Sequence, residues 1–376
     1  MAAYISFQPT DFFKTVLWTG NDTARSITGV GFQPDMTWVK ARSIAENHAL
    51  WDAVRGAGSN KAIATNGTQT ESSLNSANYG YVGAFESDGF TLAAGTGGGN
   101  AWDYINLDTK TYAAWNWKAG TTTGIAGSPS ITPDSYSFNA TSGFSIIAYT
   151  GTGSAATLPH GLGVAPDMMI IKSRTVTTDW GVYHQYCNAV PEDYTMILNT
   201  TAQAADNNLA WNDTAPTSTL FSVNAGDTNA SSKTHVAYCF ASKKGYSKFG
   251  KYNGNGNFDG PFVYTGFRPA FVMIKTFTGS SEDWKIIDDK RSTYNVTAAS
   301  LDANEADAEV TSYPICDFTS NGFKIRSNRD EYNGSTTRHY IYAAFAEFPT
   351  IVSSAPFSSA FKTQFPATLY PFLLLS

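Results

Sequence analysis

The sequence predicts an all-β fold of three tandem β-sandwich modules, and three observations support this: its composition, an internal repeat, and strands of alternating polarity. Aromatic residues make up 14% of the 376 residues and charged residues 15%, and the chain has 32 glycines. An average soluble protein carries roughly 25% charged residues. Many aromatics, few charges and frequent glycines are typical of short strands joined by tight turns. The composition therefore favours a folded β protein over a disordered chain.

A ten-residue motif, a glycine and a proline followed by an apolar run that ends on lysine, occurs three times. The copies are GFQPDMTWVK at 31–40, GVAPDMMIIK at 163–172 and GFRPAFVMIK at 266–275. They lie roughly 100 to 130 residues apart, about the length of one β-sandwich domain. In the second and third copies the run is apolar at every position, so we expect a strand covered on both faces. The lysines Lys40, Lys172 and Lys275 are expected at the strand's rim, with their ammonium groups in water.

Further elements follow each copy in the same order. A strand centred on a tryptophan (Trp51, Trp180 or Trp284) comes first, and we expect these tryptophans in a core. Each repeat then closes with a strand whose alternate residues are apolar, which is typical of a strand with one face on a core. These alternating residues are Ala113, Trp115 and Trp117, then Val236, Tyr238 and Phe240, and finally Ile341, Ala343 and Phe345.

The repeats predict modules of the jelly-roll or concanavalin-like kind at 1–122, 134–245 and 246–349. A stretch at 121–133, rich in Thr, Gly, Ser and Pro, is predicted to link the first two. The remaining residues, 350–376, carry a single charge, Lys362. So apolar a tail would be an aggregation hazard if it were free in water. We expect an extended C-terminal arm that packs on the modules or, more favourably, on another subunit.

Charge and hydropathy argue against two kinds of partner. The net charge is −6 and no basic stripe is present, so nucleic acid is not an expected partner. No stretch reaches the ~18 apolar residues of a membrane span, so membrane insertion is not expected. The N-terminal residues lack the basic and apolar regions of a signal peptide, which predicts synthesis in the cytoplasm. Cys187, Cys239 and Cys316 form no CxxC motif and are expected to be buried free thiols.

Few residues point to chemistry. None of the five histidines has a spacing that suits a metal, and we interpret His48 and His184, near two of the tryptophan-centred strands, as structural. A glycosidase needs two carboxylates flanking a cleft. The carboxylates at 288–289 and 302–309 have no counterpart in the other repeats, which favours a solvated surface. We therefore predict no catalytic, metal-binding or cofactor-binding residue.

Two tryptophans outside the repeated positions are candidates for binding sugar. Trp102 and Trp211 do not recur between the repeats and lie in loop-like sequence. An aromatic face can stack on a sugar ring, so they are the predicted glycan contacts.

The repeated motifs resemble a known family. The Gly-Phe-x-Pro-Asp…Lys strand, the strand around Gly322 and Phe323, and the closing sequence YIYAAFAE at 340–347 are similar to repeat-containing virion proteins. These are encoded by tailed phages of marine bacteria and cyanobacteria, and the similarity extends roughly from Phe12 to Pro349. The resemblance implies a tail-fibre or minor structural protein in the virion, and it offers no catalytic residues to carry over. It implies as partners other virion proteins, copies of the same chain (a trimer being favoured) and a host cell-surface glycan.

Two functions therefore stay open. The first is a non-enzymatic virion structural protein, either a tail-fibre or adhesion component or a decoration protein on the capsid surface. The second is a carbohydrate-binding lectin or a glycan-active enzyme on a sandwich fold.

Overall fold

The computed structural model describes residues 8–347. Strands account for 37% of the structure and helices for 6%, and the strands form several antiparallel sheets, which confirms the predicted all-β fold. The short helices α1 (Ser76–Tyr79), α2 (Asn208–Trp211) and α3 (Asp330–Asn333) lie in connections between strands. The predicted C-terminal arm, 350–376, falls outside the described residues.

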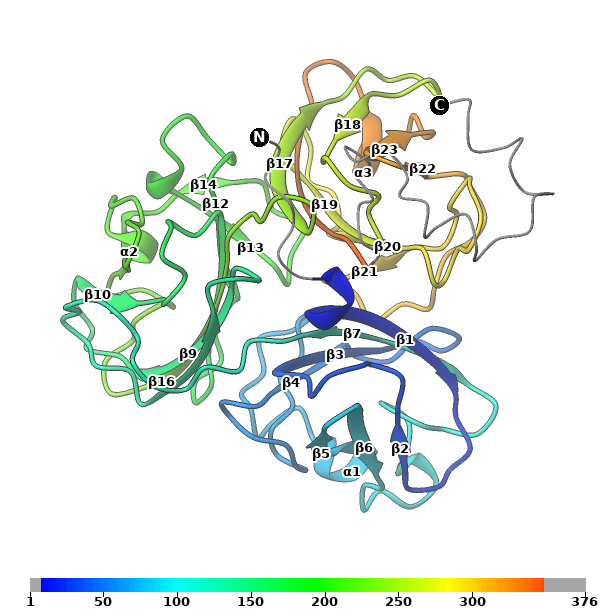
Figure 1. The fold of residues 1–376 in the computed structure, drawn as a ribbon, viewed down its shortest axis with the longest axis horizontal. Coiled ribbons are helices and arrows are strands. Elements are labelled where there is room, and N and C mark those ends of the chain that lie inside the picture. The colour runs from blue at the N-terminus through cyan, green and yellow to red at the C-terminus, as the bar shows by residue number, and fades with distance from the viewer. Residues whose placement is uncertain (1–7, 348–376) are drawn as a thin grey trace, which may run out of the picture.

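The described chain forms three lobes around a common centre, which we call lobe 1 (8–118), lobe 2 (135–241) and lobe 3 (247–347) (Figure 1). Each lobe has an inner sheet, which faces the other lobes, and a smaller outer sheet. In lobe 1 the inner sheet has the order β1-β7-β3-β4 and the outer sheet β2-β6-β5. The strands of lobe 1 are β1 (Phe13–Thr19), β2 (Arg25–Ile27), β3 (Met36–Ala41), β4 (Ala49–Asp52), β5 (Tyr81–Glu86), β6 (Gly89–Ala93) and β7 (Thr111–Trp117).

Lobes 2 and 3 repeat this plan with added edge strands. The lobe 2 inner sheet has the order β14-β13-β12-β11-β16-β9-β8, and its outer sheet is β10-β15. The strands of lobe 2 are β8 (Ser135–Asn139), β9 (Phe144–Thr150), β10 (Ala156–Pro159), β11 (Met168–Ser173), β12 (Gly181–His184), β13 (Tyr194–Ile197), β14 (Ala205–Asp206), β15 (Leu220–Val223) and β16 (Thr234–Phe240).

In lobe 3 the inner sheet has the order β17-β24-β19-β20-β21 and the outer sheet β18-β23-β22. The strands are β17 (Ser247–Asn253), β18 (Phe262–Tyr264), β19 (Phe271–Thr278), β20 (Lys285–Asp288), β21 (Leu301–Asp302), β22 (Cys316–Thr319), β23 (Gly322–Ile325) and β24 (His339–Phe345).

The lysine-ending motif forms an interior strand of each inner sheet: β3, β11 and β19. In each lobe this strand pairs with the closing strand on one side and with the strand that follows it on the other. Trp38 lies opposite Trp115, Ile170 opposite Tyr238, and Met273 opposite Ala343. The three inner sheets therefore share one register, and residues can be compared between lobes position by position.

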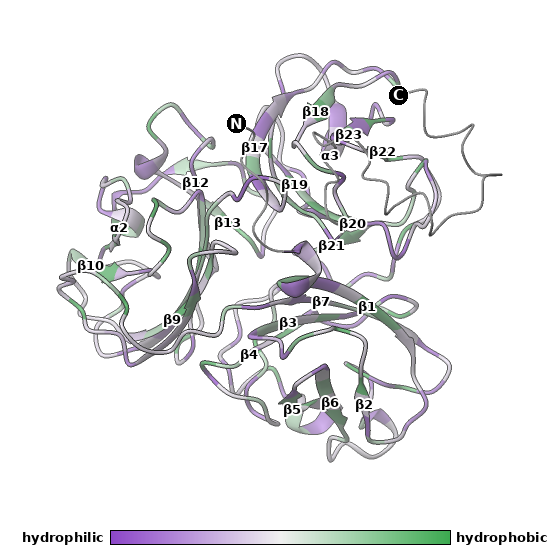
Figure 2. Cartoon of the chain, viewed as in Figure 1, coloured by the Kyte–Doolittle hydropathy of each residue, from purple (hydrophilic) through white to green (hydrophobic). Residues whose placement is uncertain are grey.

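Each inner sheet has a core on both faces. On β7, Tyr112 and Ala114 pack in the core of lobe 1, whereas Ala113, Trp115 and Trp117 enter a core shared by all three lobes. Strands covered on both faces are expected to be apolar, as the first four residues of β11 and of β19 are. Figure 2 shows this hydrophobic character along the inner strands β9 and β20. The predicted alternation of the closing strands is confirmed, but the face predicted to meet a core meets the other lobes.

The shared core converges on three equivalent aromatic residues. Trp117, Phe240 and Phe345 are the last residues of their closing strands, and their ring centroids lie 5.5 to 6.4 Å apart. They mark a pseudo-threefold axis. An apolar cavity of about 30 Å³ adjoins them, lined by residues of all three inner sheets. Because the lobes share this core, the division into modules at 1–122, 134–245 and 246–349 stays a prediction.

The cysteines are buried and free, as predicted. Cys187 lies in the shared core, Cys239 in the core of lobe 2 and Cys316 in the core of lobe 3. Burial raises the pKa of the Cys239 thiol to about 12.

Candidate functional site

The three repeated lysines lie at the junctions between lobes, and all three are fully buried. Lys40 Nζ donates a hydrogen bond to Ala306 O at 3.0 Å, in lobe 3. Lys172 Nζ donates to Thr68 O at 3.2 Å, in lobe 1. Lys275 Nζ donates to Thr201 O at 2.7 Å, in lobe 2. The expectation of lysines at a solvated rim is therefore wrong, because the neighbouring lobe covers the strand end. Desolvation lowers the pKa of each lysine to about 8.

A second hydrogen bond crosses each junction. His48 Nε2 bonds Asp302 O at 3.0 Å, Trp180 Nε1 bonds Ala64 O at 2.8 Å, and Trp284 Nε1 bonds Ile197 O at 2.9 Å. His48 Nδ1 accepts a hydrogen bond from Trp38 Nε1 at 2.8 Å. The ring hydrogen of His48 is therefore on Nε2, which is the donor to Asp302 O. Burial holds the pKa of His48 well below its usual range, so the ring is neutral.

These contacts correct the sequence alignment of the tryptophans. Trp180 and Trp284 correspond to His48, and not to Trp51, because His48 occupies the same place before the second strand of the sheet. Trp51 faces the core of lobe 1 instead. The interpretation of His48 as a structural histidine is confirmed.

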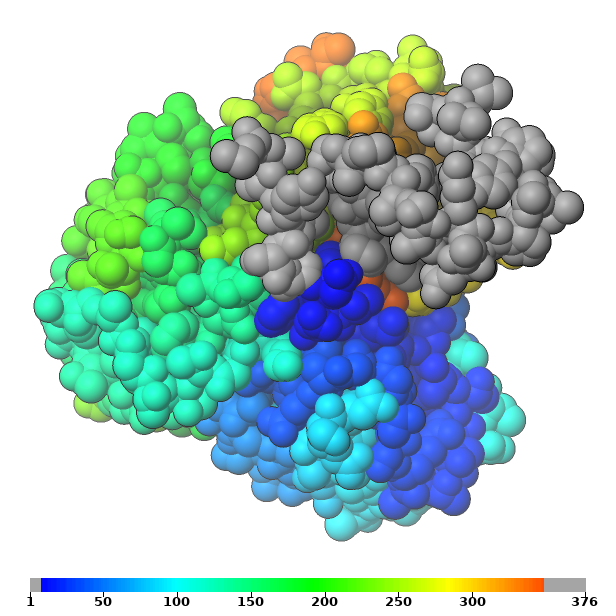
Figure 3. All heavy atoms as spheres, viewed as in Figure 1, coloured from blue at the N-terminus to red at the C-terminus, as the bar shows by residue number. Residues whose placement is uncertain are grey.

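The junctions follow one direction around the axis. The lysine of lobe 1 donates its hydrogen bond to lobe 3, the lysine of lobe 2 to lobe 1, and the lysine of lobe 3 to lobe 2. A head-to-tail interface that closes after three steps forms a ring. The three lobes of one chain are therefore arranged like the subunits of a cyclic trimer, and Figure 3 shows the surface contact between lobes 1 and 2.

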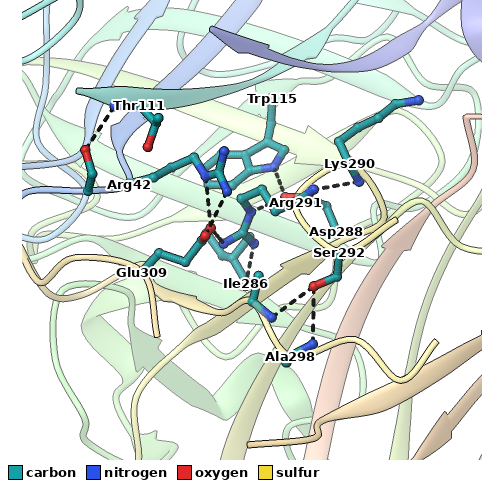
Figure 4. A network of polar contacts seen from close by, with 12 residues as sticks. Arg42, Thr111, Trp115, Ile286, Asp288, Lys290, Arg291, Ser292, Ala298 and Glu309 are labelled. Atoms are coloured by element: carbon teal, nitrogen blue, oxygen red, sulfur yellow. Dashed lines mark hydrogen bonds and ion pairs between the residues drawn. The ribbon is translucent and has the colours of Figure 1, made fainter. Parts of the chain in front are cut away.

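A buried charge network holds lobe 1 to lobe 3 (Figure 4). Arg42 of lobe 1 contacts Glu309 at 2.8 Å, and Glu309 contacts Arg291 at 3.0 Å. Arg291 contacts Asp288 at 2.5 Å. Trp115 of lobe 1 also donates a hydrogen bond from its Nε1 to Asp288 Oδ2, at 2.9 Å. Both Arg291 and Asp288 have fully buried side chains. Asp288 and Glu309 were expected on a solvated surface, and their burial at a junction corrects that expectation.

The junction between lobes 2 and 1 carries the same network. Arg174 of lobe 2 contacts Glu71 at 2.9 Å, Glu71 contacts Arg55 at 3.2 Å, and Arg55 contacts Asp52 at 2.5 Å. Tyr238 Oη completes it with a hydrogen bond to Asp52 Oδ2 at 2.6 Å. The sequence does contain a signal for both networks: an arginine two residues after the motif lysine (Arg42, Arg174), together with a repeated Asp-x-x-Arg.

The third junction is apolar at the same positions. Phe277 of lobe 3 stands where Arg42 and Arg174 stand, and its carbonyl accepts a hydrogen bond from Ala204 N at 3.3 Å. The equivalent backbone bonds join Glu309 N to Arg42 O and Glu71 N to Arg174 O. Cys187 and His184 replace the second arginine and the aspartate, and both are buried. Two junctions are thus charged and one is apolar.

The whole ring corresponds to a single sequence family. A family model described as a domain of unknown function, DUF7483, matches residues 8–349. The chain belongs to the DUF7483 family. The matched range covers all three lobes, in agreement with their shared core. No curated protein matches the DUF7483 chain, and no solved structure matches it either.

The two predicted glycan contacts differ in accessibility. Trp211 is 1% exposed and packs in the core of lobe 2, with its Nε1 bonded to Tyr194 O at 3.1 Å. Its predicted surface position is wrong, because α2 folds the ring inward, and its faces are covered. Trp102 is half-buried against the core of lobe 1, and its contact with glycan stays a prediction.

Residues 8–347 contain neither a cluster of side chains suited to a metal ion nor a helix suited to crossing a membrane. No three His, Cys, Asp or Glu side chains of this part of the DUF7483 chain gather as they would around a metal ion. None of its helices has the length and apolar character needed to cross a membrane.

Proposed function

We propose that this DUF7483 protein is a non-enzymatic structural component of a phage virion: a tail-fibre or adhesion component, or a decoration protein on the capsid surface. The observation that carries the proposal is the use of the buried charged groups. Lys40, Lys172 and Lys275, with the two arginine–carboxylate networks, all join one lobe to the next. These buried charged groups are engaged in holding the ring together.

Such a ring behaves as a rigid building block. Separating two lobes would expose the apolar surface of the shared core and break ion pairs between lobes such as Arg42–Glu309 and Arg174–Glu71, which is unfavourable. A rigid block acts through its outer surface, as a subunit in an assembly does. The resemblance of the repeated motifs to virion proteins of tailed phages supports the particle as that assembly. Other virion proteins and copies of this chain, with a trimer favoured, are the proposed partners.

Purified particles provide the test. We expect mass spectrometry of phage particles that encode this chain to detect it at a fixed copy number, and cryo-electron microscopy to place the three-lobed body on the tail or on the capsid lattice. Presence of the protein in the infected-cell lysate together with its absence from the purified particles would overturn the proposal.

A further inference from the structure

A groove of about 600 Å³ lies where lobe 1 meets the start of lobe 2. Four segments line it: 33–35 and 53–54 beside the inner sheet of lobe 1, 118–122 after β7, and 134–137 at β8. Its volume falls within the roughly 300–1,000 Å³ of small-molecule sites, which occur preferentially where domains meet.

This junction is built differently from the junction between lobes 2 and 3. A long connection, 119–134, leads from β7 into β8, an extra strand that pairs with β9 at the edge of the lobe 2 sheet. Lobe 3 instead follows lobe 2 through the short segment 241–246, directly into β17. The extra strand and the long connection supply one wall of the groove.

The floor of the groove is fixed by hydrogen bonds. The buried carboxylate of Asp35 accepts from Ser137 Oγ at 2.8 Å and from Ala119 N at 2.9 Å. Thr121 and Phe138 exchange two backbone hydrogen bonds, at 3.0 and 2.9 Å. These contacts tie β8 to lobe 1, so the groove is already shaped before any ligand arrives, which reduces the entropy lost on binding.

Several polar groups around the floor keep hydrogen-bonding capacity. Gln33 is exposed, so its side-chain amide is accessible to a ligand. Lys118 is half-buried with Nζ 5.9 Å from the ring centroid of Phe32. The exposed carboxylate of Asp134 accepts from Thr150 Oγ1 through one oxygen, at 3.0 Å, and its second oxygen stays available.

The wall also has an apolar part. Tyr136 is half-buried, with its ring partly packed on the core of lobe 2, and Val54 lines the opposite segment. The groove therefore combines donors, acceptors and an aromatic surface. Its charged groups are one ammonium, from Lys118, and two carboxylates, from Asp35 and Asp134. This balance disfavours an anionic ligand.

We propose that this groove binds a neutral oligosaccharide. Sugar hydroxyls both donate and accept hydrogen bonds, so they can donate to Asp134 and accept from Lys118 and Gln33. The C–H face of a sugar ring can pack against Tyr136 and Val54. The proposal goes beyond the assembly role and rests on the groove alone, so it would stand for a protein located elsewhere than in a virion. It also places a glycan away from Trp102 and Trp211.

Calorimetric titration of the full chain tests the proposal. The probes are four neutral trisaccharides, maltotriose, cellotriose, mannotriose and triacetylchitotriose, with sialyllactose as the anionic comparison. We expect at least one neutral sugar to bind with a Kd below about 1 mM, and Asp134→Ala and Lys118→Ala each to weaken it about 10-fold or more. The matched controls Asp206→Ala and Lys233→Ala, at exposed positions outside the groove, should bind like the wild type.

Each contrary result is decisive. Absence of binding to all four neutral sugars, binding of sialyllactose alone, or equal binding by the groove variants would overturn the proposal. Melting temperatures equal to that of the wild type confirm that the variants are folded; a misfolded variant is replaced by Gln33→Ala, which alters an exposed side chain. A negative result here leaves the virion proposal standing, because that proposal is tested on particles.

Discussion

Each of the three buried lysines satisfies a backbone carbonyl that the neighbouring lobe would otherwise bury without a donor. Lys172, for example, donates to Thr68 O in lobe 1 and, within its own lobe, to Ser173 O at 2.9 Å. An orphaned buried carbonyl is costly. The ammonium therefore acts as a three-donor connector between lobes, and its long stem lies along apolar surface.

Replacing this connector by an apolar side chain of similar length should destabilise the ring. We predict that Lys172→Met lowers the free energy of unfolding by about 2 kcal/mol, because it leaves carbonyls of two lobes without a donor. Urea denaturation measures the change. Lys233→Met, at an exposed lysine, is the matched control and should change stability by less than about 0.5 kcal/mol. Equal stability of the two variants would contradict the role of Lys172.

The same lysine makes a prediction about pH. Its pKa is about 8 in the folded protein and about 10.4 in the unfolded chain, so between these values the unfolded state binds more protons. Stability contributed by this group must therefore rise with pH across that window. From about pH 7.5 to about pH 9.5 the wild type should gain about 1–2 kcal/mol relative to Lys172→Met.

The comparison with the variant is needed because other groups titrate in this window. Burial raises the pKa of the Cys187 thiol to about 11, so that thiol lowers stability as the pH rises. Urea denaturation of both proteins at the two pH values isolates the lysine. A difference between them that stays constant with pH would show that Lys172 does not titrate as its burial implies.

At the scale of the elements, each inner sheet packs between the core of its own lobe and the shared core, and the three junctions divide into two types. Two carry an arginine–glutamate–arginine–aspartate network, and one carries Phe277, Ala204 and Cys187 in its place. If the charged surface of one junction docked against the apolar surface of another, its charged side chains would be buried without a counter-charge, which costs several kcal/mol. The side chains thus specify which lobe meets which.

Breaking one network should cost more than replacing it. Glu71→Ala leaves the buried guanidinium of Arg55 with one partner fewer, and we predict that it lowers the free energy of unfolding by about 3 kcal/mol. Transplanting the apolar junction should recover part of this loss, through the four-residue exchange Asp52→His, Arg55→Cys, Glu71→Ala and Arg174→Phe. Chemical denaturation measures both variants, with the exposed Glu305→Ala as control. A transplant less stable than Glu71→Ala would contradict the equivalence of the junctions.

The strands of these sheets can be predicted from the sequence, but which lobe packs against each strand cannot. The alternation of Ala113, Trp115 and Trp117 identifies a strand with an apolar face, because the side-chain period of a strand is two. It does not tell whether that face meets its own lobe or another. The burial of Lys40 could not be predicted for the same reason, since the lobe that covers it is distant in the chain. The place of His48 could be found from its spacing after Lys40, which matches that of Trp180 after Lys172.

At the scale of the whole molecule, the chain closes on itself. It passes from lobe 1 to lobe 2 to lobe 3, so the junction between lobes 3 and 1 is made by contacts alone. This junction has the network around Arg291 and a further ion pair between Lys14 and Glu347, at 2.7 Å. We expect such contacts, and not the peptide connections, to hold the three lobes in one body.

Cutting a connection would show whether these contacts alone keep the lobes together. A protease site inserted in the exposed stretch 122–124 of the connection between lobes 1 and 2 would allow the folded protein to be cleaved there. Native mass spectrometry and gel filtration of the cleaved sample then report whether its two pieces stay together. The ring predicts a single species with the mass of the whole chain, 40.5 kDa plus the inserted site. Separation of the pieces in native buffer would contradict it.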